Sequence, residues 1–163
     1  MMFDVQRVQK SWQQEVDGIN GLVCDLSEAE ARAPIRDDGW TTQDLIYHIV
    51  SSARSLMRMM QPPEAGGRTL ASAFERDRWN DEQRVKNAEL PWSTTRDRWT
   101  KTTHEISHAL ANLTPEDAAR PVSIPWLPQV SNVGEMLRVL VIHTRSHHSE
   151  LATGLQALAM RNC

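Results

Sequence analysis

Two histidines near the end of the chain, His143 and His147, are four residues apart. On an α-helix this spacing places both imidazoles on one face, one turn apart. Two imidazoles so placed are either half of a metal site or two ordinary histidines. If Leu140 marks the centre of the apolar stripe, His147 lies about 20° and His143 about 60° from it. The pair is therefore expected to face the interior of the fold.

A second pair with the same spacing, His104 and His108, forms the pattern HExxH with Glu105. In metalloproteases this pattern places two zinc ligands and a general base on one helix. Here both histidines lie about 160° to 200° around the helix from the apolar residue Ile106. No strand pattern supplies the sheet that such a protease needs. We therefore expect an exposed pair with no metal.

His48 is the candidate third ligand. If its helix runs antiparallel to the last helix, a rise of 1.5 Å per residue places His48 roughly 20 Å above the shared end. His143 and His147 then lie at roughly 18 and 24 Å, so the three imidazoles meet, whereas a parallel arrangement would separate them. Spacing alone leaves two interpretations open. The histidines are either core residues bonded to neighbouring side chains, or an open metal site with three nitrogen ligands. Zinc, nickel or ferrous iron would suit such ligands.

Four stretches carry apolar residues at intervals of three and four, which predicts four amphipathic helices. The expected ranges are residues 3–32, 42–61, 93–113 and 133–160. A shorter polar helix is expected within residues 69–88, and the proline-rich residues 114–130 are expected to form an ordered loop without a helix. Four such helices pack most economically as an all-α four-helix bundle, in a single domain over residues 1–163.

The connection between the second and third long helices, residues 62–91, is much longer than the 2 to 8 residues typical of helix bundles. A long connection allows the third helix to run parallel to the second, as in bundles with a crossover. This arrangement is compatible with the antiparallel second and fourth helices that a three-histidine site requires.

Composition narrows the functional classes. Lys and Arg number 18 against 21 Asp and Glu, and no basic stripe occurs, so a nucleic-acid partner is not expected. No apolar run approaches the roughly 20 residues that span a bilayer, and the polar N-terminal residues do not resemble a signal peptide. Two cysteines, Cys24 and Cys163, are too few for a disulfide framework. We expect a cytoplasmic protein with no membrane association.

Three segments together resemble the DinB/YfiT-like superfamily. Residues 40–49, WTTQDLIYHI, are similar to the W-[ST]-x-x-D-L-x-x-H-[LI] start of its second helix. His143 and His147, followed by Glu150-Leu151, are similar to the motif of its last helix. Residues 79–82 are similar to the Asn-containing stretch in the crossover of the branch that includes mycothiol-dependent maleylpyruvate isomerase. The resemblance covers nearly the full length, in order and at the usual spacing.

The resemblance implies an up-down-down-up bundle in which His48, His143 and His147 hold a divalent metal, zinc or nickel or possibly iron. It also implies an enzyme, a transferase or isomerase that uses a low-molecular-weight thiol on a small electrophilic substrate, and a homodimer. The isomerase branch has Glu at the position of His143 and an additional C-terminal domain that this sequence does not show. An activity other than maleylpyruvate isomerisation is therefore expected.

Two further functions stay open at this point. The same three histidines would serve a metal-dependent hydrolase that activates water. Alternatively, the bundle is a non-enzymatic stress-response or small-molecule-binding protein. Asn80 is a candidate for orienting cofactor or substrate, with a helix cap or surface amide as the alternative. Trp40 and Trp126 are candidates for lining the pocket, although tryptophans in a bundle usually pack the core.

Overall fold

The computed structural model describes residues 4–61, 73–124 and 127–161. These residues form helices and no strand, which confirms the expected all-α fold. The helices, in chain order, are α1 (Val5–Val23), α2 (Glu28–Arg32), α3 (Thr42–Met59), α4 (Ala73–Ala88), α5 (Trp92–Ala111), α6 (Pro115–Ala119) and α7 (Val133–Arg161). Within the described ranges, no helix is both long and apolar enough to cross a membrane.

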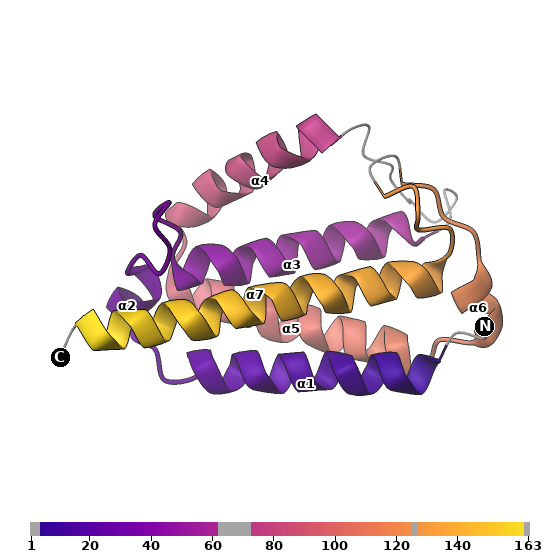
Figure 1. Cartoon of the computed structure of the whole chain (residues 1–163), viewed down its shortest axis with the longest axis horizontal. Helices are drawn as coiled ribbons and strands as arrows, with labels where there is room; N and C mark the ends of the chain where they lie inside the picture. The colour runs from indigo at the N-terminus through magenta and orange to yellow at the C-terminus, as the bar shows by residue number, and fades with distance from the viewer. Residues whose placement is uncertain (1–3, 62–72, 125–126, 162–163) are drawn as a thin grey trace.

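The four long helices, α1, α3, α5 and α7, form the bundle (Figure 1). Helices α1 and α7 run in one direction and α3 and α5 in the other, so the topology is up-down-down-up as predicted. Each long helix packs against two of the others: α1 and α3 both contact α5 and α7. Helix α7 therefore lies between α1, to which it is parallel, and α3, to which it is antiparallel.

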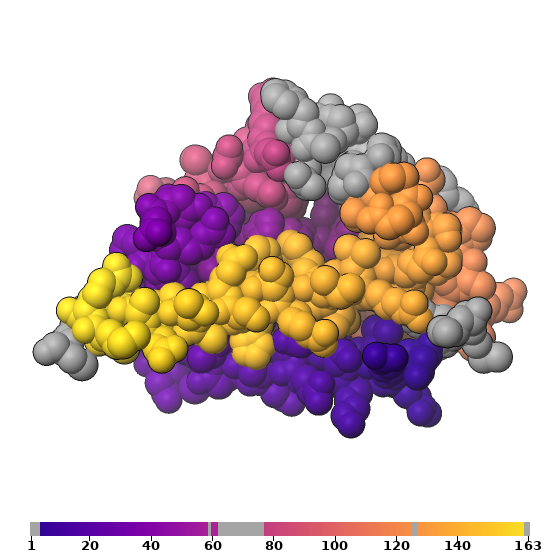
Figure 2. Space-filling view, in the orientation of Figure 1, coloured from indigo at the N-terminus to yellow at the C-terminus, as the bar shows by residue number. Residues whose placement is uncertain are grey.

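The predicted apolar stripes become the core. Ile19, Leu45, Ile49, Ile106 and Leu140 come from all four long helices, and each is at most 1% exposed. Removal of these side chains from water drives the association of the helices. In the space-filling view α7 lies along α1, and α3 is recessed between α7 and α4 (Figure 2).

Helix α4 belongs to the long crossover between α3 and α5. Because α3 and α5 are parallel, the chain must return along the bundle before α5 begins, and α4 runs in this return direction (Figure 1). Its C-terminal end is fastened to α3: Gln43 Nε2 donates to the carbonyl oxygens of Asn87 and Leu90, at 3.2 and 2.8 Å. Toward its N-terminal end α4 diverges from α3. Helix α4 therefore covers only part of α3.

Two predictions of where helices begin and end are wrong, because a capping box starts a short helix in each segment. The single helix expected over residues 3–32 ends at Val23, and α2 begins at Glu28, because Ser27 and Glu30 form a capping box that starts a new helix. Residues 114–130 contain the short helix α6, whose first turn is closed by a capping box of Thr114 and Asp117. In both cases a capping box starts a helix that apolar periodicity alone did not predict.

The start of the third long helix also differs from the prediction, and that of the fourth agrees with it. Helix α5 begins at Trp92, one residue before the expected start, with Pro91 at the N-cap position and no side-chain cap. Helix α7 starts as expected after Asn132, whose side-chain oxygen accepts the backbone N–H of Glu135 at 2.9 Å.

Gly154 on α7 allows a close approach to the loop that precedes α3. A Cβ added there would lie 2.7 Å from both the Cβ and the carbonyl oxygen of Ile35. We expect Gly154→Ala to lower the free energy of unfolding by about 1–3 kcal/mol, because backbone must move. Gly21→Ala on α1 is the matched control, since nothing lies within 4 Å of its added Cβ. It should stabilise by about 0.5–1 kcal/mol through helix propensity. Urea denaturation measures both; equal shifts would contradict the close approach.

Candidate metal centre

His48 is positioned by the capped start of α3. Thr41 Oγ1 accepts the backbone N–H of Asp44 at 3.1 Å, and Asp44 Oδ2 accepts that of Thr41 at 3.0 Å. This capping box fixes the residue at which α3 begins. Leu45 and Ile49 are fully buried in the core. Because His48 is one residue, or 100°, from Ile49, its ring lies on the flank of the apolar stripe and points toward α7.

The rotation of α7 about its own axis is set by contacts with α1. Arg145 Nε donates to Glu15 Oε1 at 2.7 Å, and His148 Nδ1 lies 2.8 Å from Glu15 Oε2. Although burial favours the protonated form, the hydrogen bonds from Arg145 and His148 lower the pKa of Glu15. With Arg145 and His148 turned toward α1, the positions two residues before Arg145 and two after it face the other way, toward α3. His143 and His147 occupy these positions.

The three imidazoles meet between α3 and α7. His143 Nε2 lies 3.1 Å from His48 Nε2 and 3.2 Å from His147 Nε2. The ring centroids are separated by 4.5 to 5.0 Å, and one nitrogen from each ring lies within 4.8 Å of the others. Among the described residues, this is the single cluster of three or more His, Cys, Asp or Glu side chains with such a spacing.

Burial keeps these histidines neutral. Loss of solvation, with the proximity of His143 and His147, lowers the pKa of His48 to about 3. Loss of solvation and the neighbouring His147 lower the pKa of His143 to about 4. The pKa of His147 is also lowered by burial, although the Glu150 carboxylate opposes that change. At neutral pH all three rings can offer a nitrogen lone pair.

The arrangement fits a divalent cation. Two nitrogens at 2.0–2.1 Å from a tetrahedral ion are about 3.3 Å apart, close to the 3.1 and 3.2 Å observed. Converging lone pairs repel each other unless a cation or a proton lies between them. In the described part of the chain the buried Nδ1 of His143 has no hydrogen-bond partner, so no second group holds that ring in place. The cluster can hold a metal ion.

Three residues beside the cluster come from the loop before α3 and from α7. The ring of Trp40 meets that of His48 edge-on, with centroids 5.7 Å apart. Glu150 Oε2 lies 3.3 Å from His147 Nδ1, close enough for a charge interaction but not aligned as a hydrogen bond. Arg36 joins the two, because its guanidinium donates to Glu150 at 3.0 Å and lies 5.1 Å from the Trp40 ring centroid.

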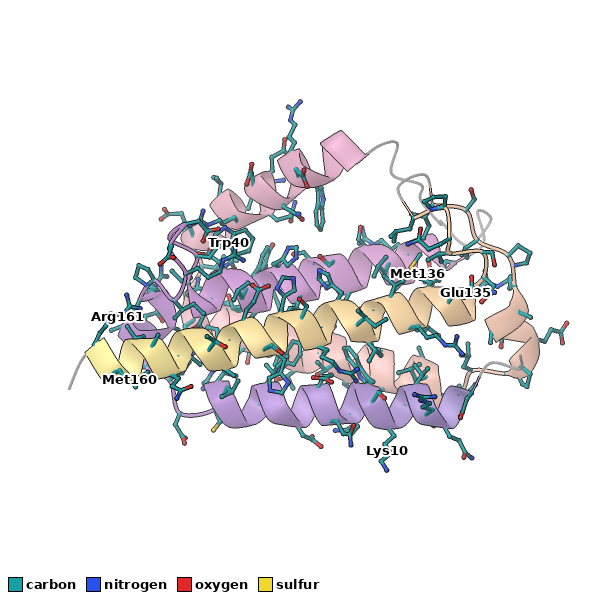
Figure 3. The ribbon with its side chains drawn as sticks, in the orientation of Figure 1. Lys10, Trp40, Glu135, Met136, Met160 and Arg161 are labelled. Carbon is teal, nitrogen blue, oxygen red and sulfur yellow. The ribbon has the colours of Figure 1, made fainter. Side chains whose placement is uncertain are left out.

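Trp40 has a second arginine on its ring. Arg84 of α4 lies 5.3 Å from the ring centroid and 3.4 Å from the carboxylate of Asp44. Figure 3 shows Trp40 between the start of α3 and the C-terminal part of α4. Sequence reasoning missed Arg36 and Arg84. Arg36 and Glu150 are 114 positions apart, and no local spacing connects them.

Among the described residues, neither Asn80 nor the HExxH pair shares a hydrogen bond or ring contact with the cluster. Asn80 is half-buried on α4, and in the described residues none of the hydrogen bonds or ring contacts of the three histidines involves it. Its role in binding stays a prediction. Trp126 lies outside the described residues. The HExxH histidines, His104 and His108, are exposed on α5 as predicted.

Comparison with known proteins supports the architecture. The sequence model of the DinB superfamily matches residues 11–151. No curated protein matches the chain in sequence. The solved mycothiol-dependent maleylpyruvate isomerase is similar with a TM-score of 0.74 at 15% identity, over 91% of this chain and 60% of the isomerase chain. This chain therefore spans less than two thirds of the length of the isomerase.

Two further solved structures share the fold over most of both chains. YfiT from Bacillus subtilis, described as a probable metal-dependent hydrolase with an unusual four-helix bundle topology, has a TM-score of 0.70 at 14% identity, over 95% of this chain and 87% of YfiT. The colibactin self-resistance protein ClbS, solved in complex with double-stranded DNA, has a TM-score of 0.73 at 11% identity, over 92% and 94%. At these identities the similarity shows the fold alone. The absence of a nucleic-acid partner stays a prediction.

The lowered histidine pKa values predict a pH dependence for the metal-free protein. Unfolded histidines titrate near 6.5, so below about pH 6.5 the unfolded chain takes up protons that His48 and His143 do not accept in the folded state. The free energy of unfolding should therefore fall as the pH decreases toward 4. His143→Gln should make the loss between about pH 7 and pH 4.5 smaller by about 2 kcal/mol.

Urea denaturation of chelator-treated protein at the two pH values measures this difference. His104→Gln is the control, because it removes an exposed histidine and should leave the pH dependence of the wild type unchanged. If the wild type and His143→Gln lose the same free energy, His143 is not held neutral by the fold.

Proposed function

The chain belongs to the DinB superfamily, and we propose that it is a divalent-metal-dependent enzyme whose ion is held by His48, His143 and His147. One observation carries the proposal: three neutral imidazoles from two helices converge, with Nε2 atoms 3.1 and 3.2 Å apart. Three protein ligands leave a tetrahedral ion one position for water or substrate, as in catalytic sites. Zinc or nickel suits this ligand set, and ferrous iron is a further candidate.

The reaction that we propose is transfer or isomerisation with a low-molecular-weight thiol, on a small electrophilic substrate. When bound, the ion would lower the pKa of a coordinated thiol and so supply a thiolate near neutral pH. The similarity in fold to the mycothiol-dependent isomerase supports this choice. The thiolate sulfur would form a bond to an electrophilic carbon of the substrate, which either releases a leaving group or takes up a proton.

The chain's own residues would prepare the site for that chemistry. Burial keeps His48 and His143 deprotonated, so both are available as ligands without first losing a proton. The Glu150 carboxylate favours a proton on the neighbouring Nδ1 of His147, which leaves Nε2 as the free nitrogen. Trp40 covers one edge of His48 and restricts the access of water from that side.

A metal-dependent hydrolase is the second candidate. The similarity to YfiT, which extends over 87% of that protein, favours it. Water would then take the fourth position, and the ion would lower its pKa. The two candidates share the three histidines and differ in the nucleophile, so the requirement for a thiol separates them.

Metal content tests the three-histidine site. Protein without an affinity tag should purify with about one divalent ion per chain, measured by elemental analysis. His143→Ala should reduce the metal content at least about tenfold, because two imidazoles remain. The double variant His104→Ala/His108→Ala removes the exposed pair with the same spacing and should keep its metal. Equal metal content in all three proteins would rule out the site.

Activity tests the nucleophile. We expect the metal-loaded protein to consume model electrophiles, such as 1-chloro-2,4-dinitrobenzene, only when a low-molecular-weight thiol is supplied, and His48→Ala to abolish this turnover. Cysteine, glutathione and mycothiol are the thiols to compare. Metal-dependent hydrolysis of model esters or amides without any thiol would support the hydrolase instead. Full metal occupancy with neither activity would favour a non-enzymatic binding protein.

A further inference from the structure

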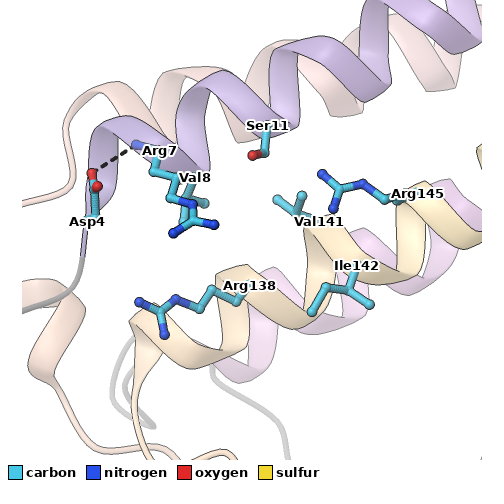
Figure 4. Close-up of a pocket in the computed structure, with 8 residues that line it drawn as sticks. All are labelled: Asp4, Arg7, Val8, Ser11, Arg138, Val141, Ile142 and Arg145. Carbon is cyan, nitrogen blue, oxygen red and sulfur yellow. Dashed lines mark hydrogen bonds between the residues drawn. The ribbon is translucent and has the colours of Figure 1, made fainter. Parts of the chain in front are cut away.

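A groove lies between α1 and α7, on the face of α7 that points away from His143 and His147. It has a volume of about 520 Å³, which is within the range of sites for small molecules. Figure 4 shows its lining: Asp4, Arg7, Val8 and Ser11 from the start of α1, and Arg138, Val141, Ile142 and Arg145 from α7. Neither the metal proposal nor the comparisons assign a role to it.

The groove is positive in a chain that is negative overall. Its lining holds three arginines and one aspartate, and Arg145 is paired with Glu15 just outside the lining, so the groove keeps a formal excess of one positive charge, whereas the whole chain carries −3. Arg7 from α1 and Arg138 from α7 extend into the same space, and Arg145 stands at the other end beside Ser11 (Figure 4). Guanidinium groups from two helices can therefore approach one anion from both sides.

Asp4 and Glu15 leave side-chain N–H donors of Arg7 and Arg145 available. The Asp4 carboxylate accepts the backbone N–H of Arg7 at 3.0 Å and so caps α1. Glu15 accepts Arg145 Nε–H at 2.7 Å, but a guanidinium has four further N–H donors. The ion pair with Glu15 also holds Arg145 at the edge of the groove. Ligand binding would therefore cost less conformational entropy of the Arg145 side chain.

The floor between the arginines is apolar. Val8 and Val141 are 7% and 5% exposed and form the base. Ile142 is 63% exposed, one of three large apolar side chains in the described residues that are open to solvent. A single exposed isoleucine is unremarkable, but here it lies between Arg138 and Arg145 in one groove. Charge and apolar surface together select an amphipathic ligand.

We propose that this groove binds a small organic anion. Arg7 and Arg138 would hold its oxyanion head, a carboxylate or a phosphate, and Arg145 and the Ser11 hydroxyl would offer further donors at the other end of the groove. Its apolar part would lie on Val141 and Ile142. The site is independent of the metal centre, because Val141 and Arg145 lie on the opposite face of α7 from the histidines.

Calorimetric titration of the full chain with octanoate and octyl phosphate tests the proposal and distinguishes the two head groups. At least one should bind with a Kd below about 1 mM. The double variant Arg7→Gln/Arg138→Gln should weaken that binding about tenfold or more, because two charge-assisted contacts are lost. Arg145 is left in place because it also fastens α7 to α1. Inorganic phosphate, which has no apolar part, should bind at least about tenfold more weakly than the better octyl ligand.

The control removes the same amount of charge elsewhere. Lys10 points away from α7, as Figure 3 shows, and Arg54 is exposed on α3, so Lys10→Gln/Arg54→Gln should keep the wild-type affinity. Thermal melting shows whether both double variants are folded. No binding of either octyl ligand, an equal loss in both variants, or unchanged affinity in Arg7→Gln/Arg138→Gln would each overturn the proposal.

Discussion

The rotation of α7 about its own axis is the constraint on which the rest of this structure depends. One face of the helix is tied to α1 by the ion pair of Arg145 with Glu15 and the contact of His148 with the same carboxylate. Glu15 is only 6% exposed, so its charge requires both partners. Because the helix is rigid, fixing this face also turns His143 and His147 toward α3. A rotation of one residue, 100°, would separate them from His48.

Close packing supports the same constraint. Gly154 lies against the backbone of Ile35, and the ring of His148 occupies the space where a Cβ of Gly18 would be. Both glycines allow α7 to approach its neighbours more closely than any other residue would. The position of α7 is therefore determined along its length by contacts that do not involve the cluster residues His48, His143 and His147. We infer that the cluster is held ready for an ion by the rest of the bundle.

The surroundings of the cluster combine burial with charge. Trp40 lies between His48 and two arginines, Arg36 and Arg84, which are themselves paired with Glu150 and Asp44. These contacts join α3, α4 and α7 at one end of the bundle, near the point where the crossover is fastened. Farther along α3, helix α4 diverges from it. Ion pairs and ring contacts thus fix one end of the site, and α4 covers the other end less.

Much of the fold could be predicted from local patterns, because helix phase and capping depend on residues only a few positions apart. The inward direction of His143 and His147, the outward direction of His104 and His108, and the capped start of α3 all follow from such short spacings. The long crossover allowed the second and third helices to run parallel. The missed starts of α2 at Ser27 and of α6 at Thr114 were also local signals, because each is a capping box of two residues three positions apart.

The sequence by itself determined which residues face inward and the order of the helices along the chain. Only the tertiary structure decided which inward residues meet. The 3.1 Å contact of His48 with His143 joins residues 95 positions apart, and the pairs of Arg36 with Glu150 and Glu15 with Arg145 are separated by 114 and 130 positions. Such contacts depend on the register and rotation of whole helices, which result from the summed packing of the core and leave no local periodicity. The groove between α1 and α7 has the same origin, because its two arginine-bearing walls come from opposite ends of the chain.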